Sequence, residues 1–445
     1  MKKALAIVLA LAMCLSFVAC GAPASQAPAS TPGAASEPAA PAAPTGPVEL
    51  NVITSFGGDD GNRKDYEIAY KSWETATGNK VLDGSASYNE EQKAKIMTMF
   101  ETNAEPDVLY YFNGADANKL VENNKVVSLE EIRSVYPDFG TNMDDNKMNN
   151  SCASPADGKV YALPLIGYWE AMFVNKAVLA AAGADVPGAT TTWADFMAIC
   201  EKVKASGKAA IAAPLSAEPH YLFEYFVYNQ DGPKTHNAAP KAKGDDTYKA
   251  WAAGLDTFAE LNTKGYFTKD ALTCSNAEAI DAFLSGDAAF FVGGSWNLNS
   301  VLTGVTADQY ENFTVTYVPA SDKRATNDLI GGLSMGFYIT RKAWENPEKR
   351  DAAVSFVKVM TQDNVVASYN QTATNALKNG SPTFGTPDVV TAAALDMIKG
   401  FNAISPAAQD NLDQTTRDAM FKLIPDVASG KMTGAEAIDA ALALS

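Results

Sequence analysis

The sequence predicts an α/β fold with more than one hydrophobic core. Apolar and polar residues alternate at 48–54, as in a half-buried strand, and 106–112 is apolar almost throughout, as in a buried strand. Segments with apolar residues at helical spacing separate these strands, and the alternation begins again after Lys159. Removing residues 1–47 from the 445 leaves 398, enough for two or more lobes with their own cores. Such alternation of strands and helices is typical of α/β proteins.

The first elements follow from these patterns in order. After the strand at 48–54, a flexible loop at 55–61 leads to a helix with apolar residues spaced i, i+3, i+4 and i+7, which ends at Gly78. The apolar residues of this helix are Tyr66, Ala69, Tyr70 and Trp73. The next expected elements are a strand at 80–82, a helix at 90–103 and the strand at 106–112.

The rest of the chain repeats the alternation. Residues 160–164 lead into a strand at 169–174, and Thr192 is the expected N-cap of a helix at 193–205 with Gly207 at its end. Residues 221–228 are unusually aromatic. Further helices are expected at 176–182, 249–264, 276–284, 347–360, 389–399, 415–428 and 434–444, and further strands at 288–292, 313–318 and 335–339.

Residues 1–19 have the pattern of a secretory signal peptide. Lys2 and Lys3 precede an apolar run at 4–18, and small Ala19 stands just before Cys20. The run is shorter than the roughly 20 residues that a membrane-spanning helix needs. The order of residues 15–21, Leu-Ser-Phe-Val-Ala-Cys-Gly, resembles the bacterial lipobox, in which the cysteine is lipidated and becomes the mature N-terminus. We therefore expect a lipid anchor at Cys20; ordinary secretion with an incidental cysteine is the alternative.

Residues 20–47 form a spacer after this cysteine. They consist almost wholly of Ala, Pro, Ser, Thr and Gly, with Glu37 as their one charge. Such a segment buries too little apolar surface to offset the entropy of folding, and its prolines favour extended chain. We expect a disordered tether that holds a folded body away from a membrane.

Composition excludes several classes of function. The net charge of −17, or −19 once Lys2 and Lys3 leave with the signal, disfavours binding of nucleic acid or anionic lipid. Two histidines leave little room for histidine-based catalysis, and no P-loop, HExxH or GxSxG motif is present. The three later cysteines, Cys152, Cys200 and Cys274, lack disulfide or zinc spacing, so we expect them to be small buried side chains.

Four stretches of the sequence carry a resemblance to a known family. In order they are similar to the patterns DGKxYALP…YNK, AGL..P.TWDEF, F..GKAAM…GSW and GG…I…S.NPE.A..F..FL. They lie at residues 157–176, 182–196, 283–296 and 331–360. On these stretches the chain resembles the extracellular solute-binding proteins of ABC importers, of the sugar-binding type related to maltose-binding protein (family 1 lipoproteins). Val174 and Phe291 stand where the family usually has tyrosine and methionine, and both changes are conservative.

The resemblance implies a two-lobed periplasmic-binding-protein-like fold with a hinge and an interlobe ligand cleft. Lobe 1 would comprise residues 48–163 plus 334–375, and lobe 2 residues 164–333 plus 376–445. The protein would be a non-enzymatic, extracytoplasmic monomer, anchored to the cell membrane by lipidated Cys20, with no cofactor or metal. It would deliver a captured carbohydrate to the transmembrane subunits of an ABC permease.

A sugar site needs flat aromatic platforms for the C–H faces of the ring and short polar groups for its hydroxyls. Clusters of such residues follow the expected strands, where the resemblance places the cleft. The predicted solute contacts are Phe56, Asp59, Asp60, Asn89, Glu90, Tyr111, Asn113, Tyr168, Trp169, Glu170, Tyr225, Trp296 and Gly332. The same clusters contain Phe112, Asp116, Tyr221 and Glu224. By contrast, Trp73, Trp193, Trp251, Trp344 and His220 are expected to be packing or structural groups.

Three alternatives stay open at this point. The acidity of the chain favours a cationic solute such as a polyamine as the second candidate, which would need an acidic, aromatic cage. A ferric-ion binder would need a convergent tyrosine cluster. An extracellular glycoside hydrolase needs only two carboxylates at a set separation. Pairs such as Asp59 and Glu170 could supply them as far as the sequence shows.

Overall fold

The computed structural model describes residues 46–58, 60, 62–88, 90–369, 374–380 and 385–444, without the side chains of residues 90, 91 and 115. The expected signal peptide, Cys20 and nearly all of the tether lie outside these residues, as do Asp59, Asn89 and the side chain of Glu90. In the described ranges no helix combines the length and hydropathy required to cross a bilayer.

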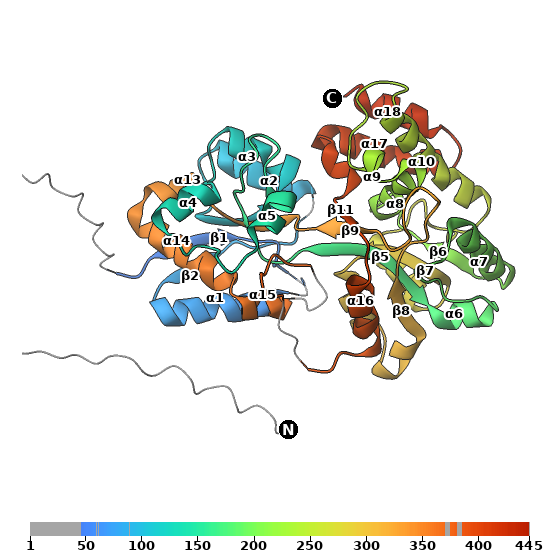
Figure 1. The fold of residues 1–445 in the computed structure, drawn as a ribbon, viewed down its shortest axis with the longest axis horizontal. Coiled ribbons are helices and arrows are strands. Elements are labelled where there is room, and N and C mark those ends of the chain that lie inside the picture. Colours follow the sequence, from blue (N-terminus) through green and yellow to red (C-terminus); the bar gives the residue numbers. More distant parts are fainter. Residues whose placement is uncertain are drawn as a thin grey trace, which may run out of the picture. The chain divides into compact units, whose positions relative to one another are not determined.

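The first of two sheets has the strand order β2-β1-β3-β10-β4 (Figure 1). Its strands are β1 (Glu49–Ile53), β2 (Lys80–Asp83), β3 (Val108–Phe112), β4 (Leu163–Pro164) and β10 (Met335–Ile339). Strand β1 runs parallel to β2 and β3, whereas β10 is antiparallel to β3 and β4. Strand β10 thus brings a segment from late in the chain into a sheet built by its first third.

Alternating burial explains how the first strand and helix fit together. In β1, Leu50 and Val52 are fully buried while Glu49 and Asn51 are exposed. Helix α1 (Arg63–Thr77) buries Tyr66, Ala69 and Trp73, and Gly78 ends it with φ of 77°. Helix α14 (Pro347–Met360) packs beside α1, and Trp73 donates from Nε1 to Ser355 on α14 at 3.0 Å.

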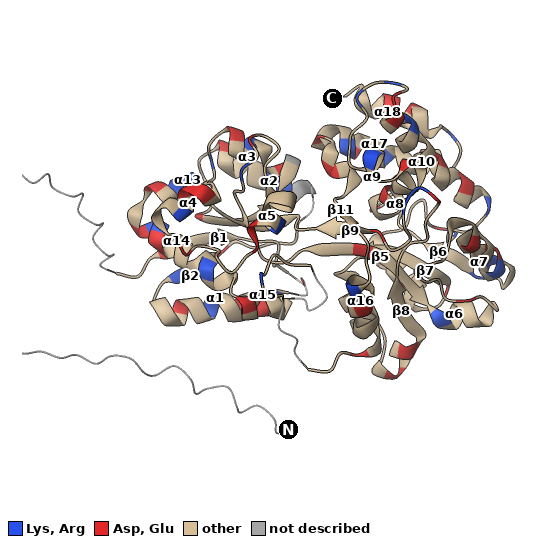
Figure 2. Cartoon of the chain, viewed as in Figure 1, with Lys and Arg blue, Asp and Glu red and all other residues tan. Residues whose placement is uncertain are grey.

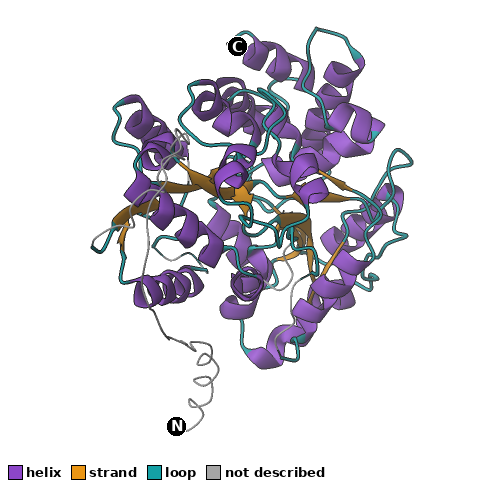
Figure 3. Ribbon diagram, turned by 60° about the vertical axis from the view of Figure 1, so that its left-hand side comes forward, coloured by secondary structure: helices purple, strands orange, loops and turns teal. Residues whose placement is uncertain are grey.

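The second sheet has the order β11-β9-β5-β7-β6, with β8 also pairing with β5. Its strands are β5 (Tyr168–Asn175), β6 (Ala209–Ala212), β7 (Ala288–Gly294), β8 (Phe313–Thr316), β9 (Leu329–Gly332) and β11 (Ile404–Ser405). Every residue of β7 is buried, because side chains pack on both faces of the sheet. Figure 3 shows the strands in the interior with helices outside them.

The remaining elements are helical. Four helices form one bundle with the second sheet: α8 (His220–Asp231), α10 (Asp246–Thr263), α17 (Gln414–Ala428) and α18 (Gly434–Leu442). The others are α2 (Glu90–Glu101), η1 (Gly114–Ala117), α3 (Asn118–Glu122), α4 (Leu129–Val135), α5 (Asp145–Cys152), α6 (Lys176–Ala181), α7 (Trp193–Ala205), α9 (Pro233–His236), α11 (Asn276–Leu284), α12 (Asn297–Gly304), η2 (Ala307–Asn312), α13 (Arg341–Glu345), α15 (Asp363–Tyr369), α16 (Val389–Lys399) and η3 (Ala408–Asn411). All described residues belong to one compact unit, Ala43–Ser445.

The α/β prediction is confirmed, and several helices have the bounds expected from sequence. Helices α7, α11, α14 and α16 begin and end at the predicted residues. Thr192 caps α7 through a capping box with Asp195, as expected. The prediction of a helix to residue 103 was too long, since α2 ends at Glu101, and the strand expected at 313–318 ends at Thr316.

Expectations about cysteine and tryptophan are also confirmed. Cys152, Cys200 and Cys274 are buried and free. Trp73, Trp251 and Trp344 are buried in hydrophobic clusters, and Trp193 packs against Phe196 and Phe226 at ring-centroid distances of 5.3 and 5.8 Å.

Candidate functional site

The ends of strands from both sheets meet at the region that holds most of the predicted solute contacts. On the first sheet these are the ends of β1 and β3 and the start of β10; on the second they are the start of β5 and the ends of β7 and β9. The polar residues after such strand ends are the usual source of ligand contacts in α/β proteins. We call this region the strand-end site.

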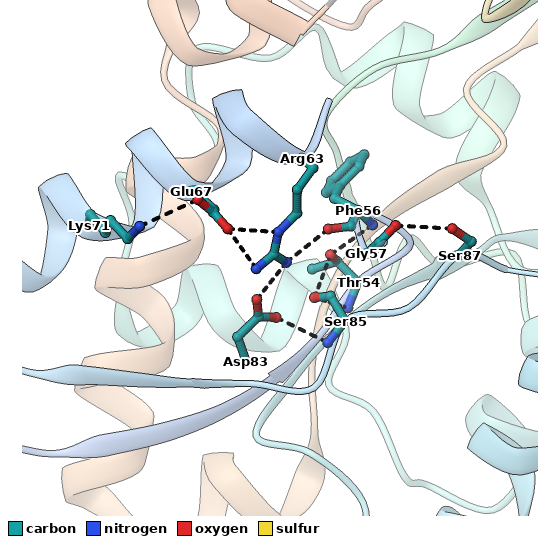
Figure 4. A network of polar contacts seen from close by, with 9 residues as sticks. All are labelled: Thr54, Phe56, Gly57, Arg63, Glu67, Lys71, Asp83, Ser85 and Ser87. Carbon is teal, nitrogen blue, oxygen red and sulfur yellow. Dashed lines mark hydrogen bonds and ion pairs between the residues drawn. The ribbon is translucent and has the colours of Figure 1, made fainter. Parts of the chain in front are cut away.

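The loop after β1 is held rigidly by a polar network, which Figure 4 shows. Arg63 donates from Nη1 to the Phe56 carbonyl at 3.0 Å and pairs with Asp83 at 2.6 Å. Ser87 donates to the Gly57 carbonyl at 3.0 Å. A Cβ at Gly57 would lie 2.4 Å from the backbone of residues 85 and 86, so only glycine fits there. The loop therefore offers a fixed backbone to the strand-end site.

Two of the predicted aromatic contacts on this sheet are buried rather than open. Phe56 is 2 % exposed and stacks on Tyr110 at 4.9 Å, and Tyr111 is equally buried. Asn113 instead lies at the end of β3, where it donates to the Leu333 carbonyl at 2.7 Å and accepts from Tyr338 at 3.0 Å. Burial raises the pKa of Asp60, against the effect of the Asn62 amide that donates to it at 2.8 Å.

The most exposed tryptophan of the described residues stands at the end of β7. Trp296 is 45 % exposed, and its ring lies 6.3 Å from Tyr168 and 5.7 Å from Tyr221. Gly294 must lack a side chain, because a Cβ would lie 2.2 Å from the Trp296 ring. The rings of Tyr168 from β5 and Tyr221 from α8 thus lie beside the partly exposed indole of Trp296, which follows β7.

Two other predicted contacts on the second sheet, Trp169 and Tyr225, are buried near Tyr168 and Trp296. Trp169 is fully buried, and its ring lies 6.1 Å from that of Phe173. Tyr225 is also fully buried; its hydroxyl donates to the Glu170 carbonyl at 2.6 Å and accepts from the Ile330 amide at 3.2 Å. Gly332 has φ of 148° and faces Tyr168 across the β5–β9 pair.

An ion network joins α2 and η1, beside the first sheet, to α17 and η3, beside the second. Asp116, in η1 after β3, pairs with Lys93 of α2 at 3.1 Å and with Arg417 of α17 at 3.3 Å. Arg417 also approaches Asp410 of η3 at 3.8 Å. The side chains of Lys93, Asp116 and Arg417 are 10, 13 and 7 % exposed, so solvent screens these pairs only weakly.

Three carboxyl groups gather beside this network. Burial, then the charge of Asp410, raises the pKa of Glu170 well above its ordinary value. Burial raises the pKa of Glu224 well above its ordinary value, and the charges of Glu170 and Asp410 raise it further. Polar contacts with the Gln409 side chain and the Ala408 backbone lower it in part. Burial and Asp116 raise the pKa of Asp410 to about 6, although Arg417 and Lys93 act against them.

A model of the bacterial extracellular solute-binding proteins matches residues 69–376, which is more than half of the chain. The chain belongs to this family. The resemblance seen in the sequence is thereby confirmed. A comparison with curated protein sequences finds no match.

Solved structures share the fold of this solute-binding protein. A chitin oligosaccharide binding protein is similar with a TM-score of 0.75 and 19% identity, over 89% of this chain and 97% of that one. A probable secreted solute-binding lipoprotein from Streptomyces coelicolor has a TM-score of 0.71 and 17% identity, over 90% and 99%. The GacH receptor of Streptomyces glaucescens has a TM-score of 0.68 and 18% identity, over 88% and 96%. These similarities confirm the two-lobed binding-protein fold.

Sequence reasoning missed several charged residues of the site in this solute-binding protein. Lys93 lies inside a helix, and Asp410 and Arg417 come from the last tenth of the chain, where no predicted strand ends. His220 was expected to be structural, and it lies beside Tyr221 with ring centroids 4.0 Å apart. Burial, then Arg417 and Lys93, lowers the pKa of His220 to about 3.

One hollow of the protein lies away from this site. In the described part of the chain, no three His, Cys, Asp or Glu side chains are grouped to hold a metal ion. A hollow of about 300 Å³ is lined by Asn175, Lys208, Gly286 and Phe313 among others. It lies at the opposite end of β5 from Tyr168, so it is separate from the strand-end site.

Replacing Asp410 with asparagine should stabilise the protein at pH 8. The folded-state pKa of about 6 exceeds the ordinary 3.8, so folding disfavours the charged form above pH 6, and this penalty disappears as the pH falls toward 4. Because the side chain is 48 % exposed, we expect a rise in Tm of only about 1–2 °C at pH 8 and none at pH 4. Thermal unfolding at both pH values measures this difference. Asp322→Asn, at a carboxylate that is 86 % exposed, is the control; a lower Tm for Asp410→Asn at pH 8 would show that the Arg417 contact dominates.

Proposed function

We propose that this solute-binding protein captures a carbohydrate and delivers it to the permease of an ABC importer. The observation that carries the proposal is the open face of Trp296, with Tyr168 and Tyr221 beside it, at the meeting point of strand ends. A flat aromatic face covers the apolar C–H face of a sugar ring. The solutes named for two proteins of the same fold, chitin oligosaccharides and acarbose, are a sugar and a sugar analogue.

The proposed solute contacts fall into two groups. Trp296 and Tyr168 would hold the faces of the ring, while Asp60, Asn113 and Glu170 would bind its edge through hydroxyl groups. Phe56, Tyr111, Trp169 and Tyr225 would hold these residues in position, because their own rings are buried. Asp59, Asn89, Glu90 and Gly332 stay proposed contacts from the sequence.

We further propose lobes at residues 48–163 plus 334–375 and 164–333 plus 376–445. Apart from Pro164 of β4, the first sheet takes its strands from the first set, and the second sheet takes all its strands from the other, which supports these bounds. The spread of Asp and Glu over the helices of both sheets agrees with a body that anionic surfaces repel (Figure 2).

The location of the protein in the cell is also part of the proposal. A signal peptide at 1–19, a lipid on Cys20 and a tether at 20–47 would place a monomer outside the cell membrane, near its permease. The lipobox-like order around Cys20 supports this, and so does the description of a similar structure as a lipoprotein. A Cys20→Ser protein should bind solute and no longer fractionate with membranes.

The binding function is tested with the protein lacking residues 1–47. Ligand-dependent rises in Tm are measured over a panel of mono- and oligosaccharides, because a solute that binds only the folded state stabilises it. We expect a rise with one sugar or a few related sugars. No rise across the panel would contradict the carbohydrate assignment. Chromatography of the incubated oligosaccharides tests catalysis: product that a carboxylate-to-amide change abolishes would show a hydrolase.

A further inference from the structure

Buried oxygen atoms that lack a hydrogen-bond donor gather at the start of β5 and α8. They are Oε2 of Glu170, both carboxyl oxygens of Glu224 and Oε1 of Gln409, and none of them accepts a hydrogen bond of normal geometry from a described residue. The three side chains are 2, 0 and 7 % exposed. The Gln409 side chain and the Ala408 backbone are near enough to Glu224 to lower its pKa. Leaving buried acceptors without a donor is costly, and native proteins rarely do so. This group, which we call the acceptor cluster, therefore calls for a donor from outside the chain.

The carboxyl groups in and beside the acceptor cluster disfavour one another's charged forms. Asp410 raises the pKa of both Glu170 and Glu224, and Glu170 also raises the pKa of Glu224. Two nearby cations, Lys93 and Arg417, pair with Asp116 and lower the pKa of Asp410.

The other titratable groups that face the cluster do not supply a positive charge. Tyr168 and Tyr221 have pKa values raised well above the ordinary value by burial and by the surrounding carboxyl groups. The pKa of His220, lowered to about 3, keeps that ring neutral at pH 7. Burial raises the pKa of Glu218, one more carboxyl near Tyr221.

Asp410 connects the cluster with solvent. Its side chain is about half exposed, whereas Glu170 and Glu224 are buried. Tyr168 lies near enough to Asp410 for that carboxyl group to raise its pKa, and its ring adjoins that of Trp296; such rings attract a cation through their faces. A cationic group on a ring held by Trp296 would thus meet Asp410 first.

We propose that the acceptor cluster and Asp410 bind the ammonium group of an amino sugar, so that the solute is a carbohydrate with a free primary amine. An ammonium group has three donors and no acceptor, which complements a cluster of acceptors without donors. A neutral sugar hydroxyl offers one donor and brings no positive charge to the carboxyl groups. This inference rests on the proposed carbohydrate binding and specifies the class of carbohydrate.

The same chemistry predicts that binding releases a proton. Before binding, the carboxyl cluster holds protons because its charged forms are unfavourable. When the ammonium arrives, an O–H bond of a carboxyl breaks, its proton passes to the buffer, and the carboxylate accepts an N–H of the solute. The ammonium group of the solute keeps its own proton. Each carboxyl group that becomes a carboxylate in this way therefore releases one proton to the buffer.

Calorimetry with paired sugars tests the inference. Glucosamine oligomers and their N-acetylated counterparts of equal length are titrated into the protein at pH 7, in phosphate and in Tris buffer. We expect the free amines to bind roughly ten- to a hundredfold tighter, the range of one charge-assisted hydrogen bond. Their enthalpy should differ between the buffers by about one released proton, and that of the acetylated sugars should not.

Asp410→Asn should reduce the preference for the amine, while Asp322→Asn, at an exposed carboxylate, should keep it. Equal affinity for both sugar series, or tighter binding of the acetylated one, would overturn the amine inference and leave carbohydrate binding intact. Binding of spermidine with no binding of any sugar would overturn the proposed function itself, together with this inference.

Discussion

Replacing Arg324 with methionine should lower the free energy of unfolding by about 3–5 kcal/mol. The guanidinium is buried and donates to Asn229 Oδ1 at 2.8 Å and to the Val318 carbonyl at 2.8 Å. It also donates to the carbonyls of Pro319, Ala325, Thr326 and Asp328 at 3.1–3.5 Å. Methionine fills similar space but donates nothing, so these acceptors would be left buried and unsatisfied.

Urea denaturation of both proteins measures the effect of Arg324→Met. Lys323→Met, at a neighbouring side chain that is 51 % exposed, is the control and should change stability by less than about 0.5 kcal/mol. A loss at Arg324 as small as that at Lys323 would mean that water satisfies the acceptors. The guanidinium also lies over the rings of Tyr225 and Tyr228 at 5.0 and 5.3 Å, so its removal should disturb the support behind Glu170.

Replacing Trp296 with alanine should weaken solute binding roughly ten- to a hundredfold, the loss expected for about 1–3 kcal/mol of aromatic contact. The indole is the most exposed aromatic ring of the strand-end site, and its partners Tyr168 and Tyr221 would lose a neighbour. Since the side chain is 45 % exposed, the fold should persist with little change in Tm.

Calorimetry with the best sugar of the panel, together with thermal unfolding, measures both quantities. Trp296→Phe should restore part of the affinity because it keeps a flat ring. Ile68→Ala, at an apolar side chain of α1 that is 58 % exposed, is the matched control and should bind as the unchanged protein does. Unchanged affinity in Trp296→Ala would place the solute elsewhere.

The sequence could predict the elements because their signals are local. The helix at 347–360 begins with Pro347 after Asn346, which caps it, and its apolar residues recur at helical spacing. The alternation in β1 shows directly which side chains face the core. Helix α8 was seen only as an aromatic stretch, because nearly all its residues are buried and leave no polar face to mark its period.

The site was predicted in part for the same reason. The order of the elements was enough to predict some of the candidate contacts, because these residues follow strands or lie near the start of one. They are Asp60, Asn113, Tyr168, Glu170 and Trp296. The burial of Phe56, Trp169 and Tyr225 was not predictable, since an aromatic side chain serves equally well as a platform or as core. Which role each takes depends on the residues that the fold places against it.

The sequence by itself determined the α/β class, most helix and strand positions, the family and the aromatic character of the site. Only the tertiary structure brought Asp116, Lys93, Arg417 and Asp410 together, because these residues are up to 324 positions apart and share no local pattern. It alone also buried Glu170 and Glu224 close together, with carboxyl oxygens that accept no hydrogen bond of normal geometry from a described residue. Periodicity and capping act over one or two turns of chain, whereas charge and burial depend on neighbours in space.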